Sequence, residues 1–354
     1  MIRILVADDS ATARALLVAL LSAEPDFHVV GEARNGREAV DMTERLAPDI
    51  VTMDIQMPEM DGFQATQELM TRTPTPIIIV SSTARLDDVE LSLEATRAGA
   101  LLVLPKPEGP SITLAAADQR HLVNMVRAMA SVKVVRRHTA GSSGPMNVFQ
   151  RPRVKETPRA RGAAAPRVVA IGASTGGPAA LQTILSELPA SFPLPILVVQ
   201  HMAHGFTGGL VHWLSGDTRL AVRVATFGEV AKPGTVYVAP DDRHLGLRLG
   251  DDKLLRLLLD GAPPLGAFRP SASYLFRSVA EALGPAALHV ILTGMGDDGL
   301  TGLRAAHAAG AHVIAQDEAS SVIYGMPREA ARAGVVNEIV GLSDIAAHLM
   351  ELAR

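Results

Sequence analysis

Acidic residues in the N-terminal third of this sequence could bind a divalent cation and accept a phosphoryl group. Asp8 and Asp9 follow the apolar run Ile2–Ala7, and Asp54 follows the apolar run Ile50–Met53. If these runs are neighbouring parallel strands, their carboxylates converge at one sheet edge, where like charges are costly without a cation. Mg²⁺ takes oxygen ligands beside phosphoryl chemistry, and the Asp54 carboxylate would be the nucleophile.

Two further polar side chains follow later apolar runs. Ser81 comes after Ile77–Val80, and Lys106 stands between Leu101–Leu104 and Pro107. Lys106 would supply positive charge to a phosphoryl group, and Ser81 would supply a hydroxyl. Any one of the acids is as readily explained as a helix cap or a solvated carboxylate. The whole set, with each member at the end of a predicted strand, favours phosphoryl chemistry.

A serine in the C-terminal half could be the nucleophile of a hydrolase. The segment Gly172–Pro178 follows the apolar run Val168–Ile171 and opens a predicted helix. Its glycines permit a sharp turn, and Pro178 suits a first helical position. Ser174 would then lie near a helix N-terminus, where free backbone N–H groups stabilise an oxyanion. Taken alone, this turn could equally be a phosphate-binding glycine loop.

A histidine and two acids follow other apolar runs of the same half. His201 lies directly after Ile196–Gln200, and Asp297 and Asp298 lie in the segment Gly294–Gly299. Together with a serine, they supply a nucleophile, a general base and an orienting carboxylate. Because adjacent residues point in different directions, only one of the two acids should reach the histidine. The order Ser, His, Asp along the chain differs from that of the α/β-hydrolases.

These side chains need two parallel sheets to position them. Apolar runs of strand length alternate with segments of helical periodicity, which predicts βαβ units with right-handed crossovers. Functional groups then collect at the carboxyl ends of the strands. In the first half we expect strands at Ile2–Ala7, His28–Ala33, Ile50–Met53, Ile77–Val80 and Leu101–Leu104, and helices at Thr12–Ser22, Arg37–Arg45, Phe63–Thr71, Val89–Ala98 and near Leu114–Ser131.

The same pattern restarts in the second half. We expect strands at Arg167–Ile171, Ile196–Gln200, Thr235–Ala239, His289–Leu292 and Ala311–Ala315, and helices at Pro178–Glu187, Ala272–Leu283, Leu300–Ala309 and Ser343–Leu352. Between the halves, Arg136–Arg167 has no hydrophobic period and reads as a flexible basic linker. A length of 354 residues also favours two domains. We therefore predict domains at 1–130 and 167–354, joined by a linker at 131–166.

Composition excludes several classes of function. The chain has no cysteine, which rules out disulfides, thiolate metal sites and a cysteine nucleophile. It has no apolar run of the roughly 18 residues that a membrane span needs, and its N-terminal run is too short for a signal peptide. The net charge of −4 does not indicate nucleic-acid binding. We expect a cytoplasmic protein that neither inserts into a membrane nor binds nucleic acid.

The N-terminal motifs resemble those of the response-regulator receiver family. The resemblance lies in Met53–Gly62, which is similar to that family's phosphorylation-site loop, and in Lys106-Pro107. It implies a (βα)5 receiver domain that is phosphorylated at Asp54, with Ser81 and Lys106 as switch residues. It also implies a Mg²⁺ ion held by Asp9, Asp54 and the carbonyl of Gln56, with Asp8 in the same acid cluster.

The C-terminal motifs resemble those of the chemotaxis protein-glutamate methylesterases. The resemblance rests on Gly172–Pro178, Gln200–Met202, Ala239–His244, Arg269–Ser271, Leu292–Gly299 and Ser321–Pro327, and it spans nearly all of Arg167–Arg354. It implies a doubly wound parallel-sheet esterase domain. It further implies that Ser174 attacks the ester, His201 relays the proton, Asp298 orients His201, and the backbone near Thr175 and Met295 forms the oxyanion site.

The same resemblance implies the biological setting. The substrates would be glutamate γ-methyl esters, and also glutamines, on methyl-accepting chemotaxis receptors. A chemotaxis histidine kinase would be the phosphodonor, and the receiver would inhibit the esterase until Asp54 is phosphorylated. The esterase reaction itself would need no cofactor.

Two other functions compete: a transcription factor, which would need a basic helix-turn-helix, and a catalytically inactive scaffold. The α/β pattern disfavours the first, and intact Ser174, His201 and Asp298 disfavour the second.

Overall fold

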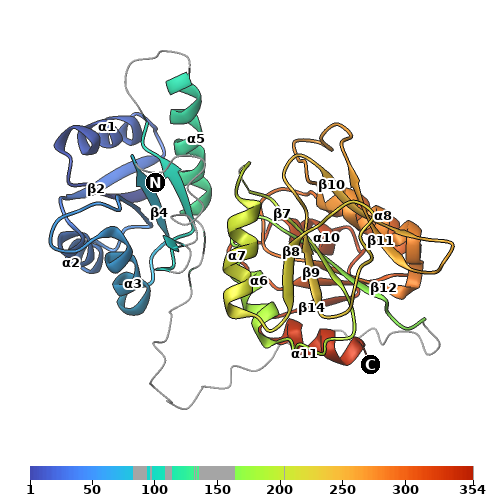
Figure 1. Ribbon diagram of the computed structural model, residues 1–354. Helices are drawn as coiled ribbons and strands as arrows, with labels where there is room; N and C mark the ends of the chain where they lie inside the picture. Colours follow the sequence, from blue (N-terminus) through green and yellow to red (C-terminus); the bar gives the residue numbers. More distant parts are fainter. Residues whose placement is uncertain are drawn as a thin grey trace. The chain divides into compact units, whose positions relative to one another are not determined.

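The chain forms two compact units, Met1–Val148 and Phe149–Arg354. The computed structural model in Figure 1 describes residues 1–82, 94–95, 98–107, 114–130, 132, 134, 164–202 and 204–353. The helix predicted at Val89–Ala98 and the linker predicted at 131–166 lie largely outside the described residues.

The N-terminal unit is built on a parallel sheet with the strand order β2-β1-β3-β4-β5. Its strands are β1 (Ile2–Ala7), β2 (Phe27–Ala33), β3 (Ile50–Met53), β4 (Ile77–Ser81) and β5 (Leu102–Pro105). Its described helices include α1 (Ala11–Ser22), α2 (Gly36–Leu46), α3 (Gly62–Arg72) and α5 (Leu114–Met129). The predicted alternation of strand and helix is confirmed. Strands β1 and β3 pair with Ala7 opposite Met53, so the residues that follow them, Asp8 and Asp54, are neighbours.

Local sequence explains how the helices of this unit begin. Ser10, Asn35 and Asp61 are the N-caps of α1, α2 and α3, and each side chain accepts a hydrogen bond from a backbone N–H of the first turn. The strands β3 and β4 are buried along their whole length, as expected where helices cover both faces of a parallel sheet. The caps and the buried strands together fix the points at which the loops carrying the acids leave the sheet.

The C-terminal unit is built on a seven-stranded sheet with the order β14-β13-β12-β6-β7-β9-β8, in which every pairing is parallel. Its strands are β6 (Val168–Ala173), β7 (Ile196–Gln200), β8 (Ala221–Val224), β9 (Thr235–Val238), β12 (Ala287–Ile291), β13 (His312–Gln316) and β14 (Glu338–Val340). Its helices are α6 (Gly177–Glu187), α7 (Thr207–Asp217), α8 (Ala272–Leu283), α9 (Leu300–Ala308), α10 (Met326–Arg332) and α11 (Leu342–Leu352), with a short 3₁₀ turn η1 at Gly284–Ala286.

Helices cover both faces of this sheet, so the predicted doubly wound fold is confirmed (Figure 1). On one face, α8 and α9 bury Leu275, Phe276 and Leu303 against the strands. On the other side, α6 packs against both α7 and α11. None of the helices in the described part of the chain combines the length and the apolar character needed to cross a membrane.

Sequence analysis missed one feature of this unit, an antiparallel hairpin formed by β10 (His244–Leu249) and β11 (Leu255–Asp260). The hairpin packs against α8. A signal for it exists, because Leu245, Leu247 and Leu249 alternate with other residues, as strand residues do. Strands β8 and β14 and helices α7 and α10 were also not predicted, and the ends of several predicted strands differ from the observed ends by one or two residues.

Candidate active site and phosphoryl-acceptor site

The turn that carries Ser174 requires glycine at two positions. Gly176 has φ +78°, and a Cβ atom there would lie 2.6 Å from the side chain of Val322. A Cβ atom on Gly177 would lie 1.9 Å from Oε1 of Gln200. The backbone therefore turns sharply between β6 and α6, because no side chain obstructs it. The Ser174 N–H donates a hydrogen bond of 3.0 Å to the carbonyl of Thr293, which ties the turn to the loop after β12.

The pairing of β6 with β7 brings the turn next to His201. Ala173 lies opposite Gln200 in this pairing, and the His201 N–H donates to the Ala173 carbonyl at 3.0 Å. The Gln200 side chain reinforces the arrangement, because its Nε2 donates to the Ser174 carbonyl at 2.8 Å and to the His201 carbonyl at 2.9 Å. Ser174 and His201 thus leave adjacent strands at the same edge of the sheet.

A buried carboxylate holds the His201 ring. His201 Nε2 lies 2.8 Å from Oδ2 of Asp298, whose side chain is only 5% exposed. The other ring nitrogen, Nδ1, is buried and makes no hydrogen bond within the described part of the chain. One ring nitrogen is therefore oriented by an acid, while the other has no partner among the described residues.

Asp298 is held by donors from the start of α8 and from its own loop. The donors are Ser271 Oγ at 2.8 Å, Ala272 N at 2.7 Å, Ser273 N at 3.1 Å and Gly299 N at 2.8 Å. Burial by itself raises the pKa of the Asp298 carboxyl, but hydrogen bonds from His201 and Ser273 outweigh burial and hold the pKa well below its usual range. The carboxylate is therefore ionised at neutral pH and fixed in orientation.

The neighbouring acid lies apart from this network. Asp297 is exposed, whereas Asp298 is buried. The structure thus brings Asp298, and not Asp297, to His201. The two adjacent acids thus differ in exposure, as expected when neighbouring side chains point in different directions.

Two residues of this site were missed as functional residues by sequence analysis. The Phe268 ring stacks on the His201 ring with centroids 4.1 Å apart and planes at 6°. Ser271 both binds Asp298 and caps α8, where its Oγ accepts from Tyr274 N at 3.3 Å. Ser271 could have been recognised as an N-cap before an apolar helix. Phe268 had no such signal, because it lies in a segment without strand or helix periodicity.

Two backbone N–H groups near Ser174 are available to a ligand. Those of Thr175 and Met295 donate no hydrogen bond to any residue that the structure describes. Gly294, beside Met295, lies close to Ser174, since a Cβ atom on Gly294 would come within 2.6 Å of the Ser174 Cβ. The carbonyl of Thr175 accepts from Thr293 Oγ1 at 2.9 Å, which fixes the peptide group that follows it.

In the N-terminal unit, a lysine joins two of the acids. Lys106 Nζ lies 2.7 Å from Asp8 Oδ2 and 2.8 Å from Asp54 Oδ2, and both acids are buried. One oxygen atom from each of Asp8, Asp9 and Asp54 lies within 4.8 Å of the others. Burial raises the pKa of the Asp8 carboxyl above its usual value, and the charge of Asp54 adds to it, although Lys106 acts in the opposite direction.

Clustered oxygen ligands with excess negative charge fit a hard divalent cation such as Mg²⁺. Asp9 and Gln56 lie exposed beside the buried pair. Ser81 ends β4 and is buried. The structure thus gathers Asp8, Asp54 and Lys106 in direct contact and places Asp9 within the same cluster.

Comparison with known proteins gives the family. The model of the CheB methylesterase family matches residues 169–349. The chain belongs to the CheB methylesterase family. In addition, the model of the response regulator receiver domain matches residues 4–118, so the N-terminal unit is a receiver domain.

Relatives match over the whole length of the chain. A protein-glutamate methylesterase/protein-glutamine glutaminase of Myxococcus xanthus is 53% identical, with 100% of this chain and 97% of the relative covered. One of Anaeromyxobacter dehalogenans is 47% identical, with 99% and 98% covered. The crystal structure of the Thermotoga maritima CheB methylesterase catalytic domain matches 53% of this chain and 100% of that domain, at 39% identity and a TM-score of 0.52.

Proposed function

We propose that this chain hydrolyses glutamate γ-methyl esters on chemotaxis receptors, and that phosphorylation of Asp54 activates the reaction. Ser174 is the nucleophile, His201 the general base and Asp298 the residue that orients His201. The observation that carries the proposal is the 2.8 Å contact between His201 Nε2 and Asp298 Oδ2. His201 and Ser174 follow the ends of two paired strands, β7 and β6. The family and the names of the relatives support the choice of substrate.

Ser174, His201 and Asp298 share the steps of ester hydrolysis. Ser174 Oγ attacks the ester carbonyl carbon while His201 Nδ1 takes its proton, and Asp298 stabilises the imidazolium that forms. The C–O bond to the methoxy group then breaks, methanol leaves with the proton from His201, and an acyl ester on Ser174 remains. Water, deprotonated by His201, attacks this ester, so that glutamate is released and Ser174 regains its proton.

The free backbone N–H groups of Thr175 and Met295 serve as donors to the oxyanion. Negative charge develops on the carbonyl oxygen in both steps, and fixed donors stabilise it without reorganisation at the moment of reaction. The Thr175 N–H shares its peptide group with the Ser174 carbonyl, which accepts a hydrogen bond from Gln200 Nε2 at 2.8 Å, and this contact keeps the donor in place. Met295 is 49% exposed, so its side chain is accessible to a large substrate such as a receptor helix.

Deamidation of receptor glutamines is part of the same proposal. Attack of Ser174 on a glutamine side chain yields the same acyl ester, with ammonia as the leaving group in place of methanol. His201 protonates the departing nitrogen, and the second step is unchanged. The double names of the relatives support both activities.

Regulation is assigned to the receiver domain. A chemotaxis histidine kinase donates the phosphoryl group to Asp54, and Asp8, Asp9, Asp54 and the Gln56 carbonyl would hold Mg²⁺. When bound, the ion offsets the negative charge that gathers during phosphoryl transfer. Lys106 and Ser81 then turn toward the phosphoryl oxygens, which alters the receiver surface. We assign no cofactor to the esterase reaction.

The test is methanol release from a methylated receptor fragment by the full-length chain after phosphorylation. Ser174→Ala should reduce the rate to the residual level that an oxyanion site provides without a nucleophile. Ser186→Ala is the matched control, because Ser186 is an exposed serine of α6 and should leave turnover unchanged. Ammonia release from a glutamine-containing fragment tests the second activity. Wild-type turnover by the Ser174 variant would refute the assignment.

A further inference from the structure

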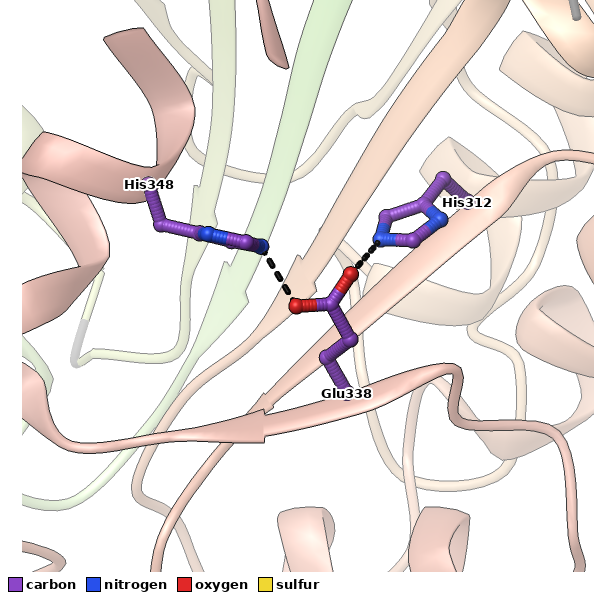
Figure 2. Close-up of side chains that lie close together, drawn as sticks. All are labelled: His312, Glu338 and His348. Carbon is purple, nitrogen blue, oxygen red and sulfur yellow. Dashed lines mark ion pairs between the residues drawn. The ribbon is translucent and has the colours of Figure 1, made fainter. Parts of the chain in front are cut away.

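Two histidines and a glutamate meet at the amino ends of the strands of the C-terminal sheet. His312 is the first residue of β13, Glu338 is the first residue of β14, and His348 lies in α11. Figure 2 shows both imidazole rings pointing to the carboxylate of Glu338. The strands are parallel, and Ser174 and His201 follow the carboxyl ends of theirs. The His312–Glu338–His348 cluster therefore lies at the amino ends of the strands, and the candidate active site lies at their carboxyl ends.

The cluster is compact and largely shielded from water. His312 Nε2 lies 2.8 Å from Oε1 of Glu338, and His348 Nε2 lies 2.7 Å from Oε2. The side chains of His312, Glu338 and His348 are 5%, 10% and 22% exposed. One ligand atom from each of the three residues lies within 4.8 Å of the other two.

Both contacts have the length of a hydrogen bond, but neither has the alignment of one. Nε2 of His312 and Nε2 of His348 are both buried without a hydrogen-bond partner in the described part of the chain, although each lies near a carboxylate oxygen. Buried polar atoms are seldom left without partners, because the loss of hydration is then uncompensated.

We propose that His312, Glu338 and His348 bind a divalent transition-metal ion, with Zn²⁺ the ion that this ligand set fits best. Zn²⁺ takes imidazole nitrogen and carboxylate oxygen at about 2.0–2.2 Å and prefers four ligands in a tetrahedral arrangement. The ion would use the lone pairs of both Nε2 atoms, which gives these atoms the partners they lack. The partial exposure of His348 leaves room for water as a fourth ligand.

The position of the cluster indicates a structural role for this ion. Strand β14 is the last strand at one edge of the sheet, and α11 ends the described chain. A single ion would join β13, β14 and α11, and α11 packs against α6, which begins just after Ser174. The ion should therefore stabilise the C-terminal unit without taking part in ester hydrolysis.

The experiment uses the full-length chain after removal of metals by a chelator. Zn²⁺ is titrated by calorimetry in excess Mg²⁺, so that the acid cluster of the receiver does not compete. We expect one tight site, a higher melting temperature with Zn²⁺, and tetrahedral absorption bands when Co²⁺ is used instead. X-ray absorption of the Zn²⁺ form should show imidazole ligands at about 2.0 Å.

Variants then assign the site. His348→Gln should weaken Zn²⁺ binding at this site by more than ~100-fold and abolish the rise in melting temperature, since even the loss of a supporting group costs ~10–100-fold. His307→Gln is the matched control, because His307 is an exposed histidine of α9 and should change neither quantity. If His348→Gln proves unstable, Glu338→Gln and the wild-type Co²⁺ spectrum provide independent measurements.

Two results would overturn the proposal. One is the absence of a tight Zn²⁺ site in the wild-type chain, which would leave the cluster as an ion pair only. The other is a tight site that survives both His348→Gln and Glu338→Gln, which would place the ion elsewhere, for example at His201. The proposal does not depend on the esterase assignment, because metal binding and melting temperature are measured without substrate.

Discussion

The ring of Phe268 lies flat against the ring of His201, with the centroids 4.1 Å apart and the planes at 6°. Asp298 holds Nε2 of the same ring from its edge. Contacts to the face and to the edge of the imidazole together restrict both its tilt and its rotation. Phe268 is therefore a positioning residue for the proposed general base.

Replacing Phe268 with alanine should lower kcat for methanol release by about 2- to 12-fold. Aromatic stacking contributes ~0.5–1.5 kcal/mol beyond burial, and each ~1.4 kcal/mol of transition-state stabilisation is tenfold in rate. The KM for receptor substrate should change less, because the contact is to His201. Phe227→Ala is the control, since Phe227 is 64% exposed. An unchanged kcat in the Phe268 variant would show that Asp298 alone positions the ring.

The two adjacent acids should differ sharply in their effect on turnover. Asp298→Asn should lower kcat by ~10³–10⁴-fold, because an amide cannot hold His201 in the tautomer that leaves Nδ1 free. It should also lower the free energy of unfolding, since the amide nitrogen would face the N–H donors of Ala272, Ser273 and Gly299. Asp297→Asn should change neither quantity, because Asp297 is exposed. The opposite order of effects would assign the orienting acid to Asp297.

His289 should make the catalytic unit less stable at acid pH. The residue is fully buried in β12, neither ring nitrogen has a partner among the described residues, and Phe276 packs edge-on at 5.4 Å. Burial lowers the pKa of His289 to about 3. Between pH ~6.5 and 3, His289 is therefore protonated in the unfolded chain but not in the folded chain. The contribution of neutral, buried His289 to the free energy of unfolding is complete above pH ~6.5 and is lost as the pH falls toward 3.

Urea unfolding of residues 164–354 at two pH values measures this effect. Between pH 8 and pH 5, the free energy of unfolding should fall by about 2 kcal/mol more in the wild-type fragment than in His289→Leu. His212→Leu, at an exposed histidine of α7, should retain the full wild-type loss. Equal losses in the wild-type and His289→Leu fragments would mean that the folded chain can protonate His289.

Asp54 should control activation and not the basal reaction. Asp54→Asn should remove the rise in methanol release that a small phosphodonor causes, which we expect to be about 5–150-fold for a coupling of ~1–3 kcal/mol. Basal turnover should persist, because no catalytic residue changes. Asp41→Asn is the control, since Asp41 is an exposed acid of α2. Activation of the Asp54 variant by the phosphodonor would assign the phosphoryl acceptor elsewhere.

Removal of the receiver domain tests whether it inhibits the esterase. The fragment 164–354 should release methanol faster than the unphosphorylated full-length chain, and the phosphodonor should no longer change its rate. The same fragment carrying Ser174→Ala corrects for background hydrolysis. A fragment slower than the unphosphorylated chain would mean that the receiver assists the reaction instead of restraining it.

The sequence by itself determined the fold class and the edge of each sheet where the chemistry gathers. Apolar runs such as Ile196–Gln200 need no partner information to be recognised as buried strands, because their length and composition are local properties. In a parallel sheet, the residue after such a run lies at the carboxyl edge. With the assumption that the first and third strands are neighbours, this rule predicted that Asp8 and Asp54 would lie close together, and the pairing of β1 with β3 confirms it.

Only the tertiary structure decided which side chains touch. The stacking of Phe268 on His201, and the group of donors around Asp298, depend on how a loop without periodicity crosses the sheet edge. The His312–Glu338–His348 cluster joins three separate elements and leaves no short motif. Contacts of this kind are set by the packing of whole helices and strands, and local periodicity contains no information about that packing.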